Sequence, residues 1–177
     1  MAEAPRTARF KGPEVLDQAQ QEIVDEIAKT RPGTGLRGPF MPWLANPELA
    51  NVCQRLGRIC RYETSFEPRH SEIIILAVAR HHKSQVEWNI HVEEARRFGV
   101  EERLIQSIEK GSLEGITGKD LTVVKFAREL LETSRVCDDM YQDMKATFSD
   151  KHAVEAVSIV GYYSFVAHTL NVFEVES

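Results

Sequence analysis

Glu87 and His91 stand four residues apart in the stretch HHKSQVEWNIHVEEA, which covers residues 81–95. Residues four apart lie on one face of an α-helix, so a helix here would place the Glu87 carboxylate beside the His91 imidazole. A carboxylate that orients an imidazole gives a pair able to take or give a proton near neutral pH, as general acid–base catalysis requires. The spacing therefore points to a proton-transfer site, provided that both groups face a pocket that excludes water.

Glu72 is the third candidate catalytic residue, because it stands directly before the apolar run IIILAVA. A carboxylate that faces inward from such a helix is costly unless it is paired or protonated. Arg80 follows eight residues later, on much the same helix face, and could hold an anionic ligand. We therefore predict that Glu72, Glu87 and His91 are catalytic and that Arg80 binds the substrate.

The same residues also have a purely structural interpretation. Ser84 and Glu87 match the Ser-x-x-Glu capping box, in which both side chains cap the first turn of a helix. His91 would then be a surface partner of Glu87, and Glu72 a first-turn acid favoured by the helix dipole. Spacing alone leaves both interpretations open, because a single Glu-x-x-x-His motif often arises by chance.

Other kinds of site match the sequence less well. The chain has no His-Glu-x-x-His motif, and Glu67-x-x-His70 has no second copy that would complete a di-iron site. His81 and His82 are adjacent, so they diverge on a helix. No Gly-x-Ser-x-Gly elbow is present, although a Ser-His-Asp site stays open. We expect neither a metal nor a cofactor.

The elements that must position these residues are predicted to be helices. Apolar residues recur at helical spacing over residues 13–30, and Asn46 and Pro47 give the N-cap and first residue of the next helix. Its apolar stripe consists of Leu49, Val52, Cys53, Leu56, Ile59 and Cys60. Pro68 opens a helix that is apolar nearly all round, as expected for the central helix of an all-α domain.

Further helices follow the central one. One is predicted from Ser84 to Phe98 with Gly99 after its end, and a short one is closed by Gly111. The last three cover residues 117–136, 138–148 and 151–173. No segment alternates like a strand, so we predict an all-α, single-domain bundle of about eight helices over residues 11–177, with residues 1–10 loose.

Two aromatic segments flank the candidate site. Phe40 and Trp43 lie in LRGPFMPWLANPE, which is more apolar than a solvated loop and is predicted to pack as a lid or against a neighbour. With Ser84 and Trp88, which share a helix with Glu87, they are candidate substrate-binding residues. The closing segment GYYSFVAHTLNVF is interpreted as an aromatic core stripe.

Composition excludes several classes of partner. The 177 residues carry a net charge of −5 without a basic stripe, which argues against nucleic acid. The longest apolar run, residues 73–79, is too short to span a bilayer, and the N-terminus lacks the apolar core of a secretory signal. We expect a cytoplasmic protein whose three cysteines are free thiols.

The pattern RHSEIIILAVARHHKSQVEWNIHVEEARRFGVEERLIQSI resembles the carboxymuconolactone decarboxylase and alkylhydroperoxidase-D-like family. The resemblance covers residues 36–110 well, and LRGPFMPWLANPELA and VGYYSFVAHTLNVFEV look like a longer, decarboxylase-like branch. It implies an all-α fold and a homo-oligomer, a trimer or hexamer, with the pocket near subunit contacts.

In the peroxidase branch of that family, a Glu is followed twelve residues on by Cys-x-x-Cys and then by a His. Glu72 and His91 match this pattern, but Ser84 and Glu87 stand at the cysteine positions. Thiolate attack on a peroxide needs a low-pKa sulfur and a resolving partner, so the sequence argues against a disulfide-cycling peroxidase. The cysteines elsewhere, Cys53, Cys60 and Cys137, do not restore the spacing.

The decarboxylase branch has a similar Glu-x-x-x-His, matched by Glu87 and His91, but lacks the Glu at position 72 and has shorter chains. The resemblance implies a cofactor-free lyase or isomerase that acts on a small organic acid or lactone, with His91 as the proton donor. The alternatives are a non-catalytic member that binds a small molecule or serves in assembly, and a hydroperoxide reductase that uses another cysteine.

Overall fold

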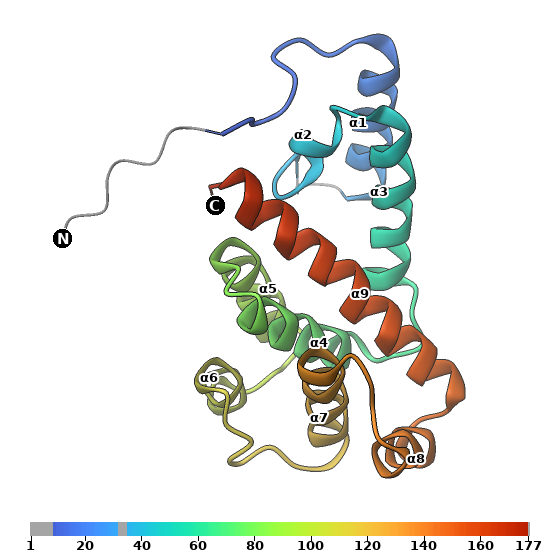
Figure 1. The fold of residues 1–177 in the computed structure, drawn as a ribbon, viewed down its shortest axis with the longest axis vertical. Coiled ribbons are helices and arrows are strands. Elements are labelled where there is room, and N and C mark those ends of the chain that lie inside the picture. Colours follow the sequence, from blue (N-terminus) through green and yellow to red (C-terminus); the bar gives the residue numbers. More distant parts are fainter. Residues whose placement is uncertain (1–8, 32–34, 177) are drawn as a thin grey trace, which may run out of the picture.

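The computed structural model describes residues 9–31 and 35–176, and all regular structure in this part of the chain is helical (Figure 1). The predicted all-α fold is therefore confirmed. The described residues form nine helices rather than about eight, and one of them, α2, is a turn of four residues. Their bounds are α1 Gln18–Thr30, α2 Phe40–Trp43, α3 Pro47–Tyr62, α4 Pro68–His81, α5 Gln85–Arg97, α6 Glu102–Lys110, α7 Gly118–Thr133, α8 Asp138–Thr147 and α9 Asp150–Phe173.

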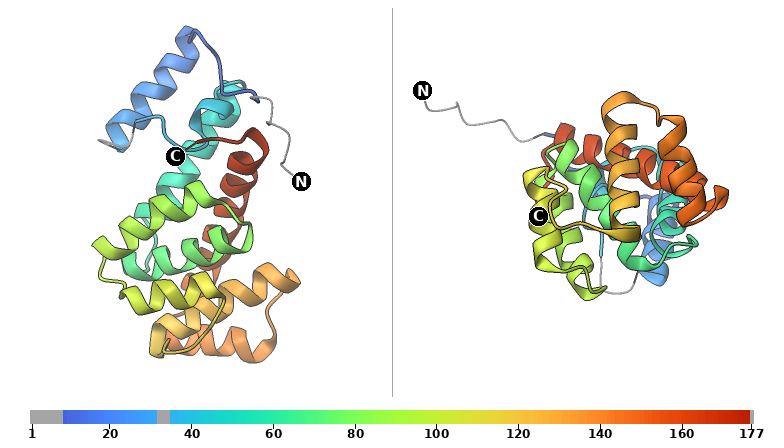
Figure 2. Two further views of the ribbon diagram at one scale, coloured as in Figure 1. Left: turned by 90° about the vertical axis from the view of Figure 1, so that its left-hand side faces the viewer. Right: turned by 90° about the horizontal axis from the view of Figure 1, so that it is seen from below.

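Helix α4 is the centre of the fold. It begins at Pro68 as predicted, and every residue from 70 to 79 is buried. It packs against α5, α6, α7 and α9. Figure 2 shows α1–α3 gathered at one end of the molecule and α6–α8 at the other, with α9 running between them. A polar side chain on α4 such as Glu72 therefore faces other helices instead of solvent.

Helix α9 is the second long element of the core. Its length and composition alone would allow it to cross a membrane, but half of its most apolar window is buried against the rest of the protein. It contacts α3, α4, α5, α7 and α8. We therefore interpret it as a core helix, in line with the aromatic core stripe predicted for this segment.

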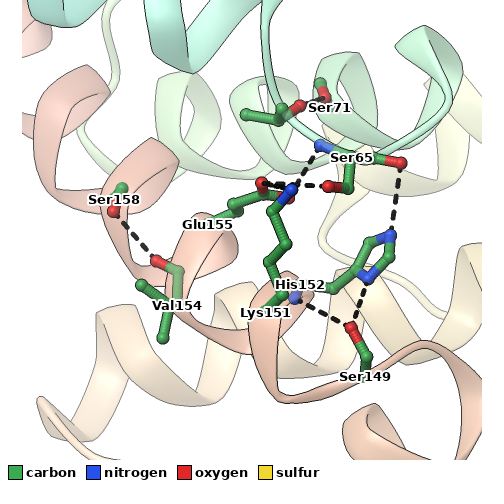
Figure 3. Close-up of polar contacts among 9 residues, drawn as sticks. Ser65, Ser71, Ser149, Lys151, His152, Val154, Glu155 and Ser158 are labelled. Atoms are coloured by element: carbon green, nitrogen blue, oxygen red, sulfur yellow. Dashed lines mark hydrogen bonds and ion pairs between the residues drawn. The ribbon is translucent and has the colours of Figure 1, made fainter.

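Polar contacts tie the first turns of α9 to the loop between α3 and α4 (Figure 3). Glu155 accepts hydrogen bonds from the backbone N–H of Ser65 at 2.8 Å and from its hydroxyl at 3.2 Å. His152 Nε2 lies 3.2 Å from the Ser65 carbonyl oxygen, and its Nδ1 lies 2.8 Å from the hydroxyl of Ser149, the N-cap of α9. In a catalytic triad the second ring nitrogen of the histidine contacts a carboxylate, whereas here it contacts a backbone carbonyl. We therefore interpret this serine–histidine pair as part of the N-terminal cap of α9.

The stripe predicted on α3 divides between two faces. Cys53 and Cys60 are buried, whereas the side chains of Leu49, Val52, Leu56 and Ile59 are 43–62% exposed. The buried face instead uses small residues, because α9 approaches α3 closely: a Cβ at Gly57 would collide with the Tyr162 hydroxyl. The prediction of the helix was correct, but the prediction of its face was wrong for these four residues.

Two predicted N-terminal boundaries also changed. Helix α1 begins at Gln18 rather than near residue 13, because Asp17 and Gln20 form a capping box that fixes the start there. Most of the segment predicted to be loose, residues 1–8, lies outside the described residues. Arg9 donates a hydrogen bond to the Val172 carbonyl at 2.7 Å, and Phe10 packs edge-on against the last residue of α9.

Candidate active site

Helix α5 starts where predicted, with Ser84 as its N-cap, but the predicted capping box is absent. The Ser84 hydroxyl and both Glu87 carboxyl oxygens are buried and have no hydrogen-bond partner among the described residues. Glu87 does not reach back to the helix end because its side chain is turned toward the protein interior, where it is 2% exposed. The structural interpretation of Glu87 as a surface cap is therefore wrong.

The histidine pairs across helices. His91 Nδ1, on α5, lies 2.6 Å from Glu72 Oε2, on α4, and both side chains are buried. A carboxylate can only accept, so Nδ1 carries the proton and Nε2 is left for another partner. The sequence predicted that Glu87 would orient His91, four residues away on the same helix. In the structure Glu72 orients it instead, which leaves Glu87 free.

Glu87 is the second carboxyl group of the site and has a different environment. Burial raises the pKa of Glu87 well above its ordinary range, and the negative charge of Glu72 raises it further. The environment of Glu87 therefore favours its neutral acid form, whereas Glu72 accepts a hydrogen bond from His91. Two carboxyl groups held in different environments are the usual arrangement for dividing proton donor from charge-stabilising roles.

Two tyrosines of α9 complete the inner wall. The Tyr163 ring meets the His91 ring edge to face at a centroid distance of 5.1 Å, and Tyr162 packs against Tyr163 in the same way at 5.3 Å. Burial raises the pKa of both phenols, so both stay neutral hydrogen-bond donors. The sequence interpretation of this segment as core was correct, yet the same residues also line a cavity.

The cavity has a volume of about 210 Å³. It is lined by residues of α3, α5 and α9, by residues 37–40 at the start of α2 and by Arg31 after α1. Among them are Glu87, His91, Tyr162, Tyr163, Phe40 and Arg61. Ile90, Val166 and Leu170 supply apolar surface. A mostly apolar hollow with a few convergent polar groups is typical of a small-molecule site.

Not every predicted substrate-binding residue reaches this cavity. Phe40 lines it, and Trp43 lies behind Phe40, stacked on Phe165 at 5.0 Å with its indole N–H donated to Thr169 at 3.0 Å. Ser84 and Trp88 instead border a separate, more open depression of about 220 Å³ at the start of α5, which Arg80 also borders.

Arg80 also lies away from the cavity. Its Nε donates to the carbonyl oxygen of Glu109 at the end of α6, at 2.8 Å. Eight residues after Glu72, a helix has turned about 80° past two full turns, and this rotation is enough to aim Arg80 at another neighbour. Arg80 therefore supports the end of α6, where a cation is favoured by the helix dipole.

Three arginines that sequence reasoning missed line the cavity, namely Arg31, Arg61 and the exposed Arg37. Arg31 follows the end of α1, and Arg61 is in the last turn of α3, where it forms an ion pair with Glu94 at 3.5 Å. Both lie outside the motif around residues 72–91, in segments whose sequence predicts only helix ends. Nothing in their spacing relates them to Glu87 or His91, and only the tertiary fold brings them together.

The three cysteines lie apart from this cavity. Burial raises the pKa of the Cys53 and Cys60 thiols, that of Cys60 to about 11, and Cys137 is exposed. None of the three is among the residues that line the described cavity. Within residues 9–31 and 35–176, no group of three or more His, Cys, Asp or Glu side chains is placed to hold a metal ion.

Comparison with known proteins supports the fold. No protein-family model matches the sequence, and no curated protein matches it either. The structure is similar to ATU0492 from Agrobacterium tumefaciens, a protein of unknown function suggested to be the antioxidant defence protein AhpD. The TM-score is 0.68 at 18% identity, over 79% of this chain and 97% of that one.

A second solved structure is similar over almost the whole chain. It is a cysteine-to-alanine variant of the debrominase Bmp8 in complex with 2,3,4-tribromopyrrole, with a TM-score of 0.72 at 10% identity, over 98% of this chain and 92% of that one. Identities this low establish the architecture alone. The chain has an alkylhydroperoxidase-D-like, all-α fold, as the sequence resemblance implied.

Proposed function

We propose that the cavity is the active site of a cofactor-free lyase or isomerase that performs acid–base chemistry on a small organic acid or lactone, as carboxymuconolactone decarboxylases do. The observation that carries the proposal is the buried 2.6 Å contact between His91 and Glu72, beside a second carboxyl group that has no protein partner among the described residues. Burying such groups is costly, and a binding site for a reacting molecule accounts for the cost.

Each residue has a distinct role in this reaction. When a carboxylate leaves as CO₂, its carbon–carbon bond breaks and the electron pair passes into a conjugated carbonyl, which becomes an enolate. The Glu87 and Tyr163 hydroxyl groups are neutral donors that can hydrogen-bond the enolate oxygen. For this step His91 must hold a second proton on Nε2, taken up from water, while the Glu72 carboxylate offsets the charge of the imidazolium. The imidazolium Nε2–H then protonates the carbon, and His91 returns to its neutral form with the proton on Nδ1. In an isomerisation, His91 Nε2 first removes the proton that it later returns.

The similarity to Bmp8 is compatible with this proposal. That protein binds a small, flat ring compound, and the cavity described here has aromatic and apolar walls. Debromination in that protein is not transferred to this chain, because its identity of 10% supports the fold alone.

Proton exchange at carbon tests the proposal before the natural substrate is identified. The protein would be incubated in D₂O with a panel of small lactones and unsaturated or keto acids, and deuterium uptake next to the carbonyl group would be followed by NMR. We expect wild-type protein to catalyse exchange for at least one compound and His91→Gln to lose it by about 100-fold or more. His81→Gln is the control, because this histidine lies outside the cavity.

The alternatives make different predictions in the same experiment. A non-catalytic binding protein would bind a compound from the panel but exchange no deuterium, and His91→Gln would change only binding. A hydroperoxide reductase would consume peroxide, and it would stop doing so when the three cysteines are replaced together.

We also propose that the protein forms a homo-oligomer, as the family resemblance implies. Support comes from the exposed stripe of Leu49, Val52, Leu56 and Ile59 on α3, whose alternating spacing of three and four residues suits a helix that packs against a second copy of itself. Light scattering after gel filtration should give a multiple of the 20.1 kDa chain mass, and Val52→Lys with Leu56→Lys should reduce it. A wild-type monomer would contradict this proposal.

A further inference from the structure

Arg31 is a buried cation with no acidic partner in the part of the chain that the structure describes. Arg31 is only 4% exposed. Its guanidinium donates to the Gln54 backbone carbonyl at 2.5 Å, to the Gln54 side-chain oxygen at 3.2 Å and to the Thr30 hydroxyl at 3.2 Å. It also lies over the Phe40 ring, 5.2 Å from the centroid. All of these partners are neutral.

Two other partly buried arginines, in contrast, each have an acidic partner. Arg61 is paired with Glu94, and Arg69 is paired with Asp120 at 2.7 Å. An isolated charge in a protein interior is strongly disfavoured, and removing its partner normally costs a great deal of stability. Burial accordingly lowers the pKa of Arg31. Among the described residues, the guanidinium of Arg31 thus lies at the cavity wall without a counter-ion.

The cluster around Arg31 also has more donors than acceptors. The Gln54 side chain is fully buried, and its amide N–H groups have no acceptor among the described residues. The guanidinium has five N–H groups, of which the contacts above use only part. A carboxylate is an acceptor-only group with four lone pairs, and it matches the planar fork of an arginine.

We propose that Arg31 binds a carboxylate of the ligand, so that the cavity selects a small unsaturated or aromatic carboxylate over its neutral analogue. The flat walls supplied by Phe40 and Tyr162 favour a planar body next to the charged group. This assignment rests on the proposed function for the identity of the site, and it moves the anion-binding role from Arg80 to Arg31. Binding of the carboxylate is independent of whether turnover follows.

Benzoate and benzamide are suitable probes, because they share a ring and differ in charge. Each would be titrated into the full-length protein at pH 7, with the melting temperature and the dissociation constant measured. We expect benzoate to bind wild-type protein more tightly than benzamide does. Arg31→Gln should weaken benzoate binding by about 10- to 100-fold, as expected for loss of a charge-assisted hydrogen bond, and leave benzamide binding unchanged.

Arg80→Gln is the matched control, because it removes an arginine outside the cavity and should leave both probes unaffected. If Arg31→Gln does not fold, Arg31→Lys serves instead: it keeps the charge but loses the two-pronged geometry, and should weaken benzoate binding by at least a few fold. Equal affinity of wild-type protein for the two probes, or undiminished benzoate binding by either Arg31 variant, would overturn the assignment.

The same measurements separate this assignment from the proposed reaction. His91→Gln should keep its affinity for benzoate while losing proton exchange. Carboxylate binding that depends on Arg31, without exchange by wild-type protein, would overturn the reaction and leave the anion site standing. Exchange of a neutral lactone at the wild-type rate by Arg31→Gln, together with undiminished benzoate binding, would overturn the anion site and leave the reaction standing.

Discussion

Replacing Glu87 by Gln tests the central electrostatic feature of the site. The wild-type carboxyl group must be protonated to remain buried, because burial and the nearby charge of Glu72 raise its pKa well above the ordinary value of 4.5. Keeping such a group protonated costs the folded state, relative to an unfolded chain in which it ionises freely, about 1.4 kcal/mol for each pH unit above 4.5 until the raised pKa is reached. Gln has nearly the same shape and needs no proton. Glu87→Gln should therefore be more stable than wild type at neutral pH.

The sign of the pH dependence follows from proton binding. Between pH 4.5 and the raised pKa, the folded protein keeps a proton that the unfolded chain has lost, so wild-type stability falls as the pH rises through this window. The Gln variant lacks this contribution. The two proteins should have similar stability near pH 4.5 and diverge above it by up to about 1.4 kcal/mol per pH unit.

Thermal denaturation between pH 4.5 and 8 measures this difference directly. For a chain of this length, a difference of about 1.4 kcal/mol per pH unit corresponds to roughly 3–6 °C in melting temperature per pH unit. Any cost of burying the Gln amide is independent of pH, so the slope of the difference between the variants is the diagnostic quantity. Glu93→Gln is the control, because it makes the same change at an exposed site on the same helix, where burial cannot contribute to the slope.

Two results would refute the reasoning. A Glu87→Gln protein whose stability difference from wild type is constant across this pH range would show that Glu87 is ionised in the folded state. Glu87→Leu, unlike Glu87→Gln, removes every hydrogen-bond donor from this side chain, so a Leu variant that retains wild-type proton exchange would show that Glu87 is not a hydrogen-bond donor in the reaction.

Three further outcomes follow from the fold. Gly57→Ala should destabilise the protein by about 1–3 kcal/mol in chemical denaturation, because the new methyl group collides with the Tyr162 hydroxyl. Gly161→Ala on α9 meets no atom within 4 Å among the described residues and should instead add up to about 1 kcal/mol; equal effects of the two changes would contradict the close contact of α3 and α9. Burial and the neighbouring His168 hold the pKa of His82 at about 4, below its ordinary 6.5, so the folded protein should lose stability as the pH falls from 6.5 toward 4. Melting curves of His82→Gln should show a weaker loss over that window, and an unchanged loss would show that this histidine does not cause it.

The helix ends were predictable because they depend on local chemistry. Pro68 at the start of α4, Asn46 as the N-cap of α3 and Gly111 in the left-handed conformation after α6 each act within one turn of chain. The start of α1 was misplaced because the prediction relied on apolar spacing and overlooked the Asp17 cap. The exposed face of α3 was misassigned for a different reason: apolar spacing identifies a stripe but not what packs against it.

The site was predictable in its residue types but not in its pairing. Glu72 and His91 belong to different helices, and their contact depends on how α4 and α5 cross, which spacing within α5 cannot show. No sequence pattern pointed to Arg31, because it stands out only by having no counter-ion among the described residues of the folded protein. The spacing of eight residues between Glu72 and Arg80, by contrast, suggested that both lie on one helix face. This was misleading, because eight residues leave a rotation of about 80° between the two side chains.

Ser84 and Glu87 stand at the two cysteine positions of the peroxidase motif, but they lie at different places relative to the cavity. In the peroxidase branch that the sequence resembles, both positions are cysteines, but here only Glu87 lines the cavity, while Ser84 borders a depression outside it. Redox cycling needs two thiols that reach each other, whereas proton transfer needs one acid that reaches the ligand. Under the proposed function, a carboxyl group at the inner position, beside a histidine oriented by Glu72, would supply a proton-transfer group while the same helices hold it.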